Sequence, residues 1–261
     1  MKNLTILKIG GNVIDNKVLL QSILEKFSGW SENRILIHGG GKIANELMLQ
    51  LGIEPLMNGG RRITDKKTLE IVTSVYAGLI NKNIVCNLQS KNCNAFGLTG
   101  ADGNVIPATL RPVKEIDYGF VGDINPQDIN IPIITSLLEN NLIPVFAPIT
   151  HDKCGQLLNT NADTIASSLA VALAGTYKVK LVFCLEKNGV LINPDDLTSV
   201  IPEITEKTFL KYVTDGKIHS GMIPKLENAF KALNSGVSEI NICGPAAFDD
   251  ENFVAGTKIV I

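Results

Sequence analysis

The sequence predicts an α/β protein, with a mostly parallel β-sheet whose two faces are both covered by helices. Two observations support this fold class. Apolar segments of strand length alternate with segments of helical period along the 261 residues. Some strand segments, such as residues 34–37 and 180–183, place three large apolar residues in succession. Strands of this kind are typical of a sheet buried on both faces, as parallel sheets are.

The first half of the chain begins with the order strand, helix, strand, helix. Residues 4–9 and 34–37 are apolar runs followed by glycine, which favours strands. Residues 16–28 have helical period, and residues 42–51 repeat Ile43, Leu47 and Leu51 on one helical face. A long helix is expected over residues 65–91. Gly, Pro and Asp then separate three short extended segments, residues 95–98, 105–110 and 118–121, for which we expect β-hairpins.

The alternation returns in the second half of the chain. It predicts helices over residues 132–139, 162–174 and 224–234, and strands over residues 142–147, 180–185, 239–243 and 257–261. An alanine-rich helix ends near residues 175–179, where we expect the boundary between two lobes. The sequence therefore divides into residues 1–177 and residues 178–261.

Composition excludes several classes of partner. The chain has 24 Lys and Arg against 26 Asp and Glu, a net charge of −2, so no global field attracts nucleic acid or an anionic membrane. No apolar run approaches the ~18–20 residues of a membrane span, and the first strand starts at Leu4 with no charged leader. The five cysteines form no zinc-ligand spacing and are odd in number, which suits a reducing compartment. We expect a cytoplasmic protein with small-molecule partners.

Two glycine clusters follow the first two predicted strands, Lys8-Ile9-Gly10-Gly11-Asn12 and His38-Gly39-Gly40-Gly41-Lys42. Ligands of an open parallel sheet gather at the carboxyl ends of its strands, where helix N-termini present unpaired N–H groups. Glycine lets the backbone approach such a ligand closely. Tight turns alone are the other interpretation, but two clusters on neighbouring strands favour an anion site.

Two lysines could neutralise that anion. Lys8 closes an apolar strand, where a snorkelling side chain is the simpler explanation. Lys225 follows Pro224, which is typical of the first helical turn, so its ammonium lies at the positive end of a helix. A cation there is mildly unfavourable unless an anion is near. A solvated lysine at a helix start remains the alternative.

Polar residues precede the alanine-rich helix in the segment Asn159-Thr160-Asn161-Ala162-Asp163. Helix capping by Asn161 or Thr160 explains one of these side chains, and Asp163 favours the positive helix end. The remaining polar groups could bind a substrate or orient the two lysines. Arg61 and Arg62 offer planar forks suited to a carboxylate, although exposed arginines in a loop are common.

A series of motifs spans nearly the whole chain in a fixed order: Lys8-Ile-Gly-Gly11, His38-Gly-Gly-Gly41, Asn58-Gly-Gly-Arg-Arg62-Ile-Thr64, Gly97-Leu-Thr-Gly-Ala-Asp-Gly103, Gly119-Phe-Val-Gly-Asp123, Pro144 to Pro148, Gly155-Gln-Leu-Leu-Asn-Thr-Asn-Ala-Asp163, Ser220-Gly-Met-Ile-Pro-Lys225 and Gly256-Thr-Lys258. In these motifs the chain resembles the amino acid kinase family, and within it the members that phosphorylate N-acetylglutamate in arginine biosynthesis.

The resemblance implies a three-layer α/β/α sandwich with a mainly parallel eight-stranded sheet. It implies that residues 1–177 bind the acylated glutamate and form a homodimer, and that residues 178–261 bind ATP, whose phosphates hold Mg²⁺. The implied catalytic set is Lys8, Lys225 and Asp163, in which Asp163 orients the lysines. The implied substrate-binding residues are Gly40, Gly41, Arg62, Asn159 and Asn161, and the implied nucleotide-binding residues are Gly10, Gly11, Glu186, Gly189 and His219.

The chain departs from the family pattern in three places. Glu186 and its neighbours stand where the family usually carries an aspartate, and His219 stands where a small residue is common. The N-terminal helical extension associated with arginine-inhibited hexamers is absent, so we expect a homodimer without arginine feedback. The acyl group, acetyl or succinyl, stays open, as does another amino acid kinase activity.

Two other classes are weighed against a kinase. The first is a dinucleotide-binding dehydrogenase, whose pattern the segment Gly39-Gly-Gly41-Lys-Ile-Ala44 formally fits. Against it, the segment follows the second strand, and no acidic residue is clearly placed at a strand end for the ribose ~20 residues on. The P-loop pattern fails because Leu36 and Ile43 occupy two of its required positions. A catalytically silent binding protein is the third class, and the presence of Lys8, Asp163 and Lys225 together argues against it.

Overall fold

The computed structural model describes residues 1–193, 195–218, 222–249 and 255–261. Its centre is an eight-stranded sheet, and the neighbouring strands are all parallel except β13 and β14. This confirms the predicted fold class. The strand order is β12 (Glu203–Thr205), β14 (Thr257–Val260), β13 (Glu239–Cys243), β11 (Tyr177–Cys184), β1 (Lys2–Ile9), β2 (Asn33–His38), β8 (Ile143–Phe146) and β5 (Ala95–Leu98).

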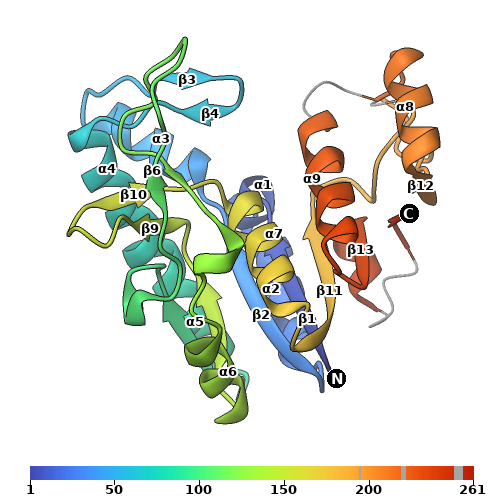
Figure 1. Ribbon diagram of the computed structural model, residues 1–261, viewed down its shortest axis with the longest axis horizontal. Coiled ribbons are helices and arrows are strands. Elements are labelled where there is room, and N and C mark those ends of the chain that lie inside the picture. Colours follow the sequence, from blue (N-terminus) through green and yellow to red (C-terminus); the bar gives the residue numbers. More distant parts are fainter. Residues whose placement is uncertain (194, 219–221, 250–254) are drawn as a thin grey trace.

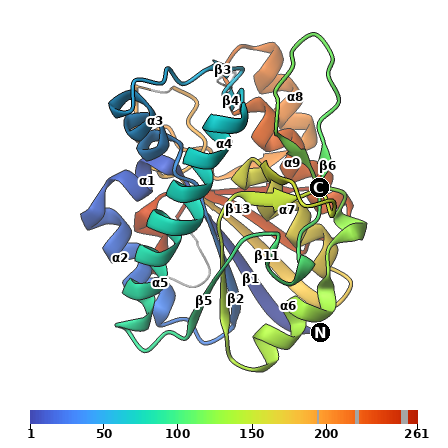
Figure 2. The ribbon, with the colours of Figure 1, turned by 90° about the vertical axis from the view of Figure 1, so that its left-hand side faces the viewer.

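Helices cover both faces of this sheet, so the architecture has three layers (Figures 1 and 2). Alternate residues of β1 enter two separate cores: Leu4 and Ile6 lie in one, Leu7 and Ile9 in the other. The first core contains α6 (Ile131–Glu139), α7 (Ala162–Leu173), α8 (Glu206–Thr214) and α9 (Ile223–Asn234). The second contains α1 (Gly11–Asp15), α2 (Lys17–Ser28), α3 (Gly41–Gln50), α4 (Lys66–Thr73), the π-helix η1 (Ser74–Ile80) and α5 (Asn81–Gln89).

Short two-stranded pairs complete the fold: β3 (Met57–Asn58) with β4 (Arg61–Arg62), β6 (Thr109–Leu110) with β7 (Gly122–Asp123), and β9 (Ile149–His151) with β10 (Leu157–Asn159). β3 and β4 lie at the top of the molecule, beyond the carboxyl ends of β1 and β2 (Figure 1). Three short 3₁₀ segments, η2 (Asp102–Asn104), η3 (Pro126–Asp128) and η4 (Pro245–Asp249), join the larger elements. No helix among the described residues is long and apolar enough to cross a membrane.

The hairpin prediction for the middle of the chain was partly wrong. Thr109–Leu110 and Gly122–Asp123 do pair antiparallel, but Ala95–Leu98 is the last strand of the main sheet and runs parallel to β8. The preceding helix α5 returns the chain along the sheet, and pairing with β8 buries Ala95 and Leu98. A surface hairpin would have left those two side chains in water.

The prediction also missed β12 and α8. The sequence signal for α8 is a capping box at its start. The Thr205 side chain accepts from the Thr208 backbone N–H, and the Thr208 side chain accepts from the Thr205 backbone N–H. In the long predicted helix, the Asp65 side chain caps α4, and the π-helix η1 interrupts regular α geometry between α4 and α5.

The second glycine cluster is shaped by η1. Gly40 precedes α3 with φ of +147°, and a Cβ at this position would lie 2.2 Å from the Ile80 Cδ1 atom and 3.3 Å from the Tyr76 ring. Ile80 and Tyr76 both belong to η1 and are buried. The close approach of this helix to the loop therefore requires glycine at position 40.

His38 holds the start of the same loop. Its imidazole is fully buried, Nδ1 donates to the Gly39 carbonyl at 2.8 Å, and Nε2 accepts from the Asn81 amide at 3.2 Å. Burial outweighs the hydrogen bond to Gly39 and lowers the pKa of His38 to about 4. His38 is thus a neutral packing residue.

We expect Gly40→Ala to lower the free energy of unfolding by more than about 2 kcal/mol, because it combines an unfavourable backbone conformation with a clash. Urea denaturation measures the loss. The matched control is Gly52→Ala, since Gly52 also has positive φ but its Cβ would meet no atom within 4 Å; we expect this variant to lose about 1 kcal/mol. Equal losses in the two variants would contradict the packing argument.

The lowered pKa of His38 predicts a dependence of stability on pH. In the unfolded chain the imidazole binds a proton below about pH 6.5, whereas in the folded chain it stays neutral down to about pH 4. Unfolding free energy should therefore fall by up to about 1.4 kcal/mol per pH unit across that window as pH decreases. Denaturation of the wild type and of His38→Gln measures this contribution, and the variant should show a shallower slope. Identical slopes would contradict a buried neutral imidazole.

Candidate active site

The site forms at the carboxyl end of β1, the strand between the two halves of the sheet. Lys8 follows Leu4 and Ile6 on the same face of β1, and α7 covers that face. Asp163 lies in the first turn of α7. The Lys8 Nζ atom lies 2.8 Å from Asp163 Oδ1. The alternation of side chains along β1 therefore directs Lys8 towards the first turn of α7 and not into the apolar core.

Lys225 reaches the same carboxylate from the other half of the molecule. It lies in the first turn of α9, and its ammonium pairs with Asp163 Oδ2. The ammonium also lies 5.1 Å from the centroid of the Phe183 ring, and Phe183 is the β11 partner of Lys8 in the sheet register. The Asp163 carboxylate thus offsets the unfavourable position of the Lys225 ammonium at the positive end of α9.

The three charged groups are largely shielded from water, with side chains 10% exposed for Lys8, 13% for Lys225 and 23% for Asp163. Burial by itself would raise the pKa of Asp163, but the two ammonium groups and their hydrogen bonds outweigh burial and hold that pKa well below its usual range. For Lys225, burial lowers the pKa, and the Asp163 carboxylate opposes that change. Asp163 is therefore ionised at neutral pH and holds two like charges together.

The cap of α7 orients Asp163. The Asn161 side chain accepts hydrogen bonds from the backbone N–H of Asp163 at 2.8 Å and of Thr164 at 3.2 Å. This confirms the capping interpretation of Asn161. Asn159 also lies at the site, and its amide donates to the Thr64 hydroxyl at 3.0 Å.

Two cavities meet at Lys8 and Gly11. The larger, of about 440 Å³, is lined mainly from the second half of the chain and includes Gly10, Glu186 and Gly189. The smaller, of about 320 Å³, is lined by residues between Lys8 and Asp163. It includes Asp163 and all five predicted substrate residues: Gly40, Gly41, Arg62, Asn159 and Asn161. Two ligands bound in these cavities would approach each other beside the two lysines.

The glycine backbone is only partly available to a ligand. Gly10 N–H donates to the Cys184 carbonyl at 3.1 Å, and Gly39 N–H donates to the Ile9 carbonyl at 3.2 Å, so both extend the sheet. Gly11 borders open space, because a Cβ there would meet no atom within 4 Å. Gly41 opens α3 beside the smaller cavity. Among these glycines, Gly11 and Gly41 are the positions whose first-turn N–H groups can reach a ligand.

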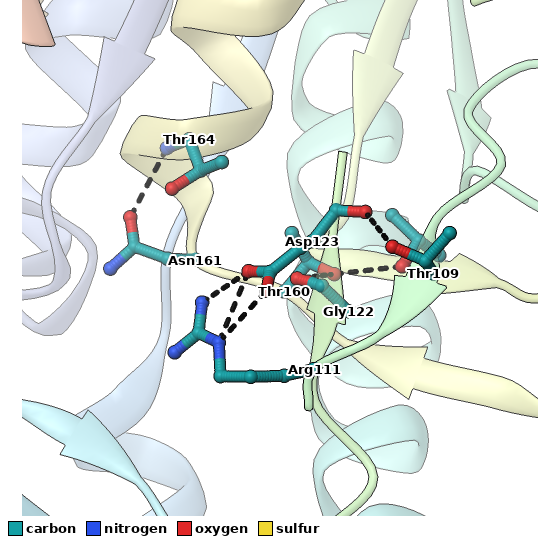
Figure 3. Close-up of polar contacts among 8 residues, drawn as sticks. Thr109, Arg111, Gly122, Asp123, Thr160, Asn161 and Thr164 are labelled. Carbon is teal, nitrogen blue, oxygen red and sulfur yellow. Dashed lines mark hydrogen bonds and ion pairs between the residues drawn. The ribbon is translucent and has the colours of Figure 1, made fainter. Parts of the chain in front are cut away.

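Two arginines border the smaller cavity with fixed orientations. Arg62 is buried, and its guanidinium donates to the Gly41 carbonyl at 3.1 Å and to the Asn45 side chain. Arg111 was missed by the sequence analysis. Its guanidinium forms an ion pair with the Asp123 carboxylate (Figure 3), in which Nε donates to the two carboxylate oxygens at 3.1 and 3.2 Å. Asp123 ends the motif Gly119-Phe-Val-Gly-Asp123, and its carboxylate was the one sign in the sequence that a cationic side chain pairs with this motif.

The nucleotide-binding predictions lie around the larger cavity. The exposed Glu186 carboxylate accepts a hydrogen bond from the Asn12 amide at 2.8 Å, which joins the loop after β11 to the first turn of α1. His219 lies outside the described residues. No group of three or more His, Cys, Asp or Glu side chains that could hold a metal ion occurs in the described part of the chain.

Comparisons with known proteins agree on one family. Residues 3–244 match the Amino acid kinase family. An acetylglutamate kinase of Cytophaga hutchinsonii is 53% identical over 267 residues, covering 100% of this chain and 99% of its own. An acetylglutamate kinase of Bacteroides thetaiotaomicron is 50% identical over 258 residues, covering 99% and 98%. The crystal structure of smu.665 from Streptococcus mutans superimposes with a TM-score of 0.82 at 30% identity, covering 100% and 99%.

Proposed function

The chain belongs to the amino acid kinase family, and from this premise we propose that it transfers the γ-phosphoryl group of ATP to the side-chain carboxylate of N-acetyl-L-glutamate. The products are N-acetyl-L-glutamyl 5-phosphate and ADP, in a step of arginine biosynthesis. Full-length relatives at about 50% identity carry the name acetylglutamate kinase, which supports this acceptor.

One structural observation carries the proposal: Lys8 lines both cavities, and the carboxylate of Asp163, which lines the smaller one, holds the ammonium groups of Lys8 and Lys225 together. Phosphoryl transfer needs positive charge around the moving group and alignment of the attacking and leaving oxygens. Two preorganised ammonium groups between two ligand cavities meet both needs.

The chemistry of the acceptor requires no general base. A free glutamate side chain has a pKa near ~4.3, so the acceptor carboxylate is already ionised at neutral pH. Its oxygen attacks the γ-phosphorus directly, and the bond between that phosphorus and the bridging oxygen breaks, so the electron pair leaves with ADP. Lys8 and Lys225 stabilise the charge on the phosphoryl oxygens. Asp163 positions the two lysines.

In this proposal each of the two substrates binds in one of the two cavities. We assign N-acetyl-L-glutamate to residues 1–177 and the smaller cavity, where it is bound by Gly40, Gly41, Arg62 and Asn159. Arg62 binds its α-carboxylate. Asn161 contributes mainly by capping α7. ATP belongs to residues 178–261 and the larger cavity, beside Gly10, Gly11, Glu186 and Gly189. Mg²⁺ would be held by the ATP phosphates and would offset their charge.

Assembly and location are part of the same proposal. A homodimer is supported by β5, which is the last strand on one side of the main sheet and carries the 43% exposed Phe96. A reducing compartment such as the cytoplasm is supported by the cysteines, all five of which are free thiols.

A coupled ADP-release assay tests the activity. We expect turnover with ATP, Mg²⁺ and N-acetyl-L-glutamate, and little turnover with free L-glutamate, whose α-ammonium replaces the neutral amide of the acceptor. Trapping the acyl phosphate with hydroxylamine confirms that the carboxylate is the acceptor. ADP release that needs no N-acylglutamate, or that occurs only with free glutamate, would refute the assigned acceptor.

Removing either lysine should slow the chemical step. We expect Lys8→Ala and Lys225→Ala each to lower kcat by about 10² or more, the size of the loss of one preorganised oxyanion donor. Lys207→Ala is the matched control, since Lys207 is exposed on α8 and lines neither cavity. Near wild-type kcat in the Lys8 variant would remove that residue from the mechanism.

A further inference from the structure

We propose that Phe183 is a positioning residue for phosphoryl transfer, and that the face of its ring keeps the Lys225 ammonium in place beside Asp163. The interaction is a cation–π contact, in which the negative face of an aromatic ring attracts a positive charge. The inference deepens the proposed function and rests on it, because it concerns one of the two lysines that act on the moving phosphoryl group.

The charge balance of the site is the first argument. Lys8 and Lys225 share the single carboxylate of Asp163, so one negative charge faces two positive charges. No second carboxylate pairs with either ammonium in the part of the chain that the structure describes. Both lysine side chains are largely shielded from water, which would otherwise stabilise the excess charge. The site is therefore stabilised by any further negative potential beside an ammonium group.

The Phe183 ring supplies such a potential at Lys225. The ammonium lies 5.1 Å from the ring centroid, within the ~6 Å range of a cation–π contact. The ring is fully buried, and this contact is strongest where water does not compete with it. Among the described residues no aromatic ring faces Lys8 in this way, so the ring acts on one of the two lysines.

The fold fixes the ring at this place. Phe183 is the residue of β11 that lies opposite Lys8 of β1 in the sheet register, so the two side chains lie on the same face. α7 covers both strands on that face and packs against α9, which carries Lys225 (Figure 1). Residues of both helices belong to the same apolar core as the ring. Lys225 is therefore enclosed between a carboxylate on α7 and a ring on β11.

The protonation of Lys225 depends on the same surroundings. Burial lowers its pKa, the Asp163 carboxylate opposes that change, and the charge of Lys8 lowers the pKa further. Asp163 on α7 and Lys8 on β1 are the charged groups of the described chain that face Lys225. The negative face of the ring favours the ammonium form, so it acts in the same direction as Asp163.

Fluorinated phenylalanines test the contact with little change in shape, because fluorine withdraws electron density from the ring face. Mono-, di- and trifluorinated phenylalanines are each introduced in place of Phe183 by nonsense suppression. The coupled ADP-release assay is then run with ATP, Mg²⁺ and N-acetyl-L-glutamate. We expect kcat to fall stepwise with the number of fluorine atoms, by about threefold or more for the trifluorinated ring, with KM for the acceptor unchanged.

Phe146 is the matched control. Its ring is also fully buried in the same core, and no cation lies over it in the described chain. The same fluorinated series at Phe146 should leave kcat unchanged. Phe183→Leu keeps an apolar side chain but removes the ring, so it should lower kcat at least as much as trifluorination and retains the test if a fluorinated variant does not fold.

The pKa of Lys225 gives a second readout that needs no turnover. NMR titration of the enzyme with isotope-labelled lysine measures it, and Lys225→Arg assigns the signal. Trifluorination of Phe183 should lower this pKa, because a weaker ring face stabilises the ammonium form less.

The outcomes separate this inference from the proposed function. Turnover by the wild type with a kcat that does not depend on fluorination, or that falls equally in the Phe146 series, would overturn the inference and leave the kinase activity standing. An unchanged pKa of Lys225 would also overturn it. Absence of wild-type turnover with any N-acylglutamate would overturn the proposed function instead, and the titration would then decide whether the ring acts on Lys225.

Discussion

The structure depends on one electrostatic arrangement, in which the Asp163 carboxylate keeps two ammonium groups close together in a place largely shielded from water. Lys8 and Lys225 would repel each other at that site without an anion between them. Burial alone would favour a neutral carboxyl group, but the two lysines keep it ionised. The same arrangement explains how a lysine can occupy the positive first turn of α9.

The fold makes this arrangement possible by placing β1 at the centre of the sheet. β2 and β11 flank β1 in parallel, so the loops that follow these strands meet at one edge. Alternation along β1 then points Lys8 at α7, while the neighbouring residues enter the two apolar cores. A cavity opens on each side of Lys8, which gives two ligands a common boundary.

Sequence reasoning was strongest where a residue pattern has a single physical meaning. The polar segment before α7 formed the predicted cap through Asn161, and the helical segment that starts near Asp65 is helical as predicted. It was weaker for Ala95–Leu98, because a four-residue strand carries no information about which partner it joins. It missed Arg111, whose significance depends on contacts with Asp123 and Tyr118 that local sequence does not express.

The sequence by itself determined the fold class, the family and the identity of the three charged residues, because periodicity, glycine clusters and ordered motifs are properties of neighbouring residues. Only the tertiary structure decided that these three side chains meet, that the N–H groups of Gly10 and Gly39 bond to neighbouring strands, and that arginines border the smaller cavity. The reason is that charge pairing and cavity shape depend on residues far apart in the chain, and packing alone brings them within reach.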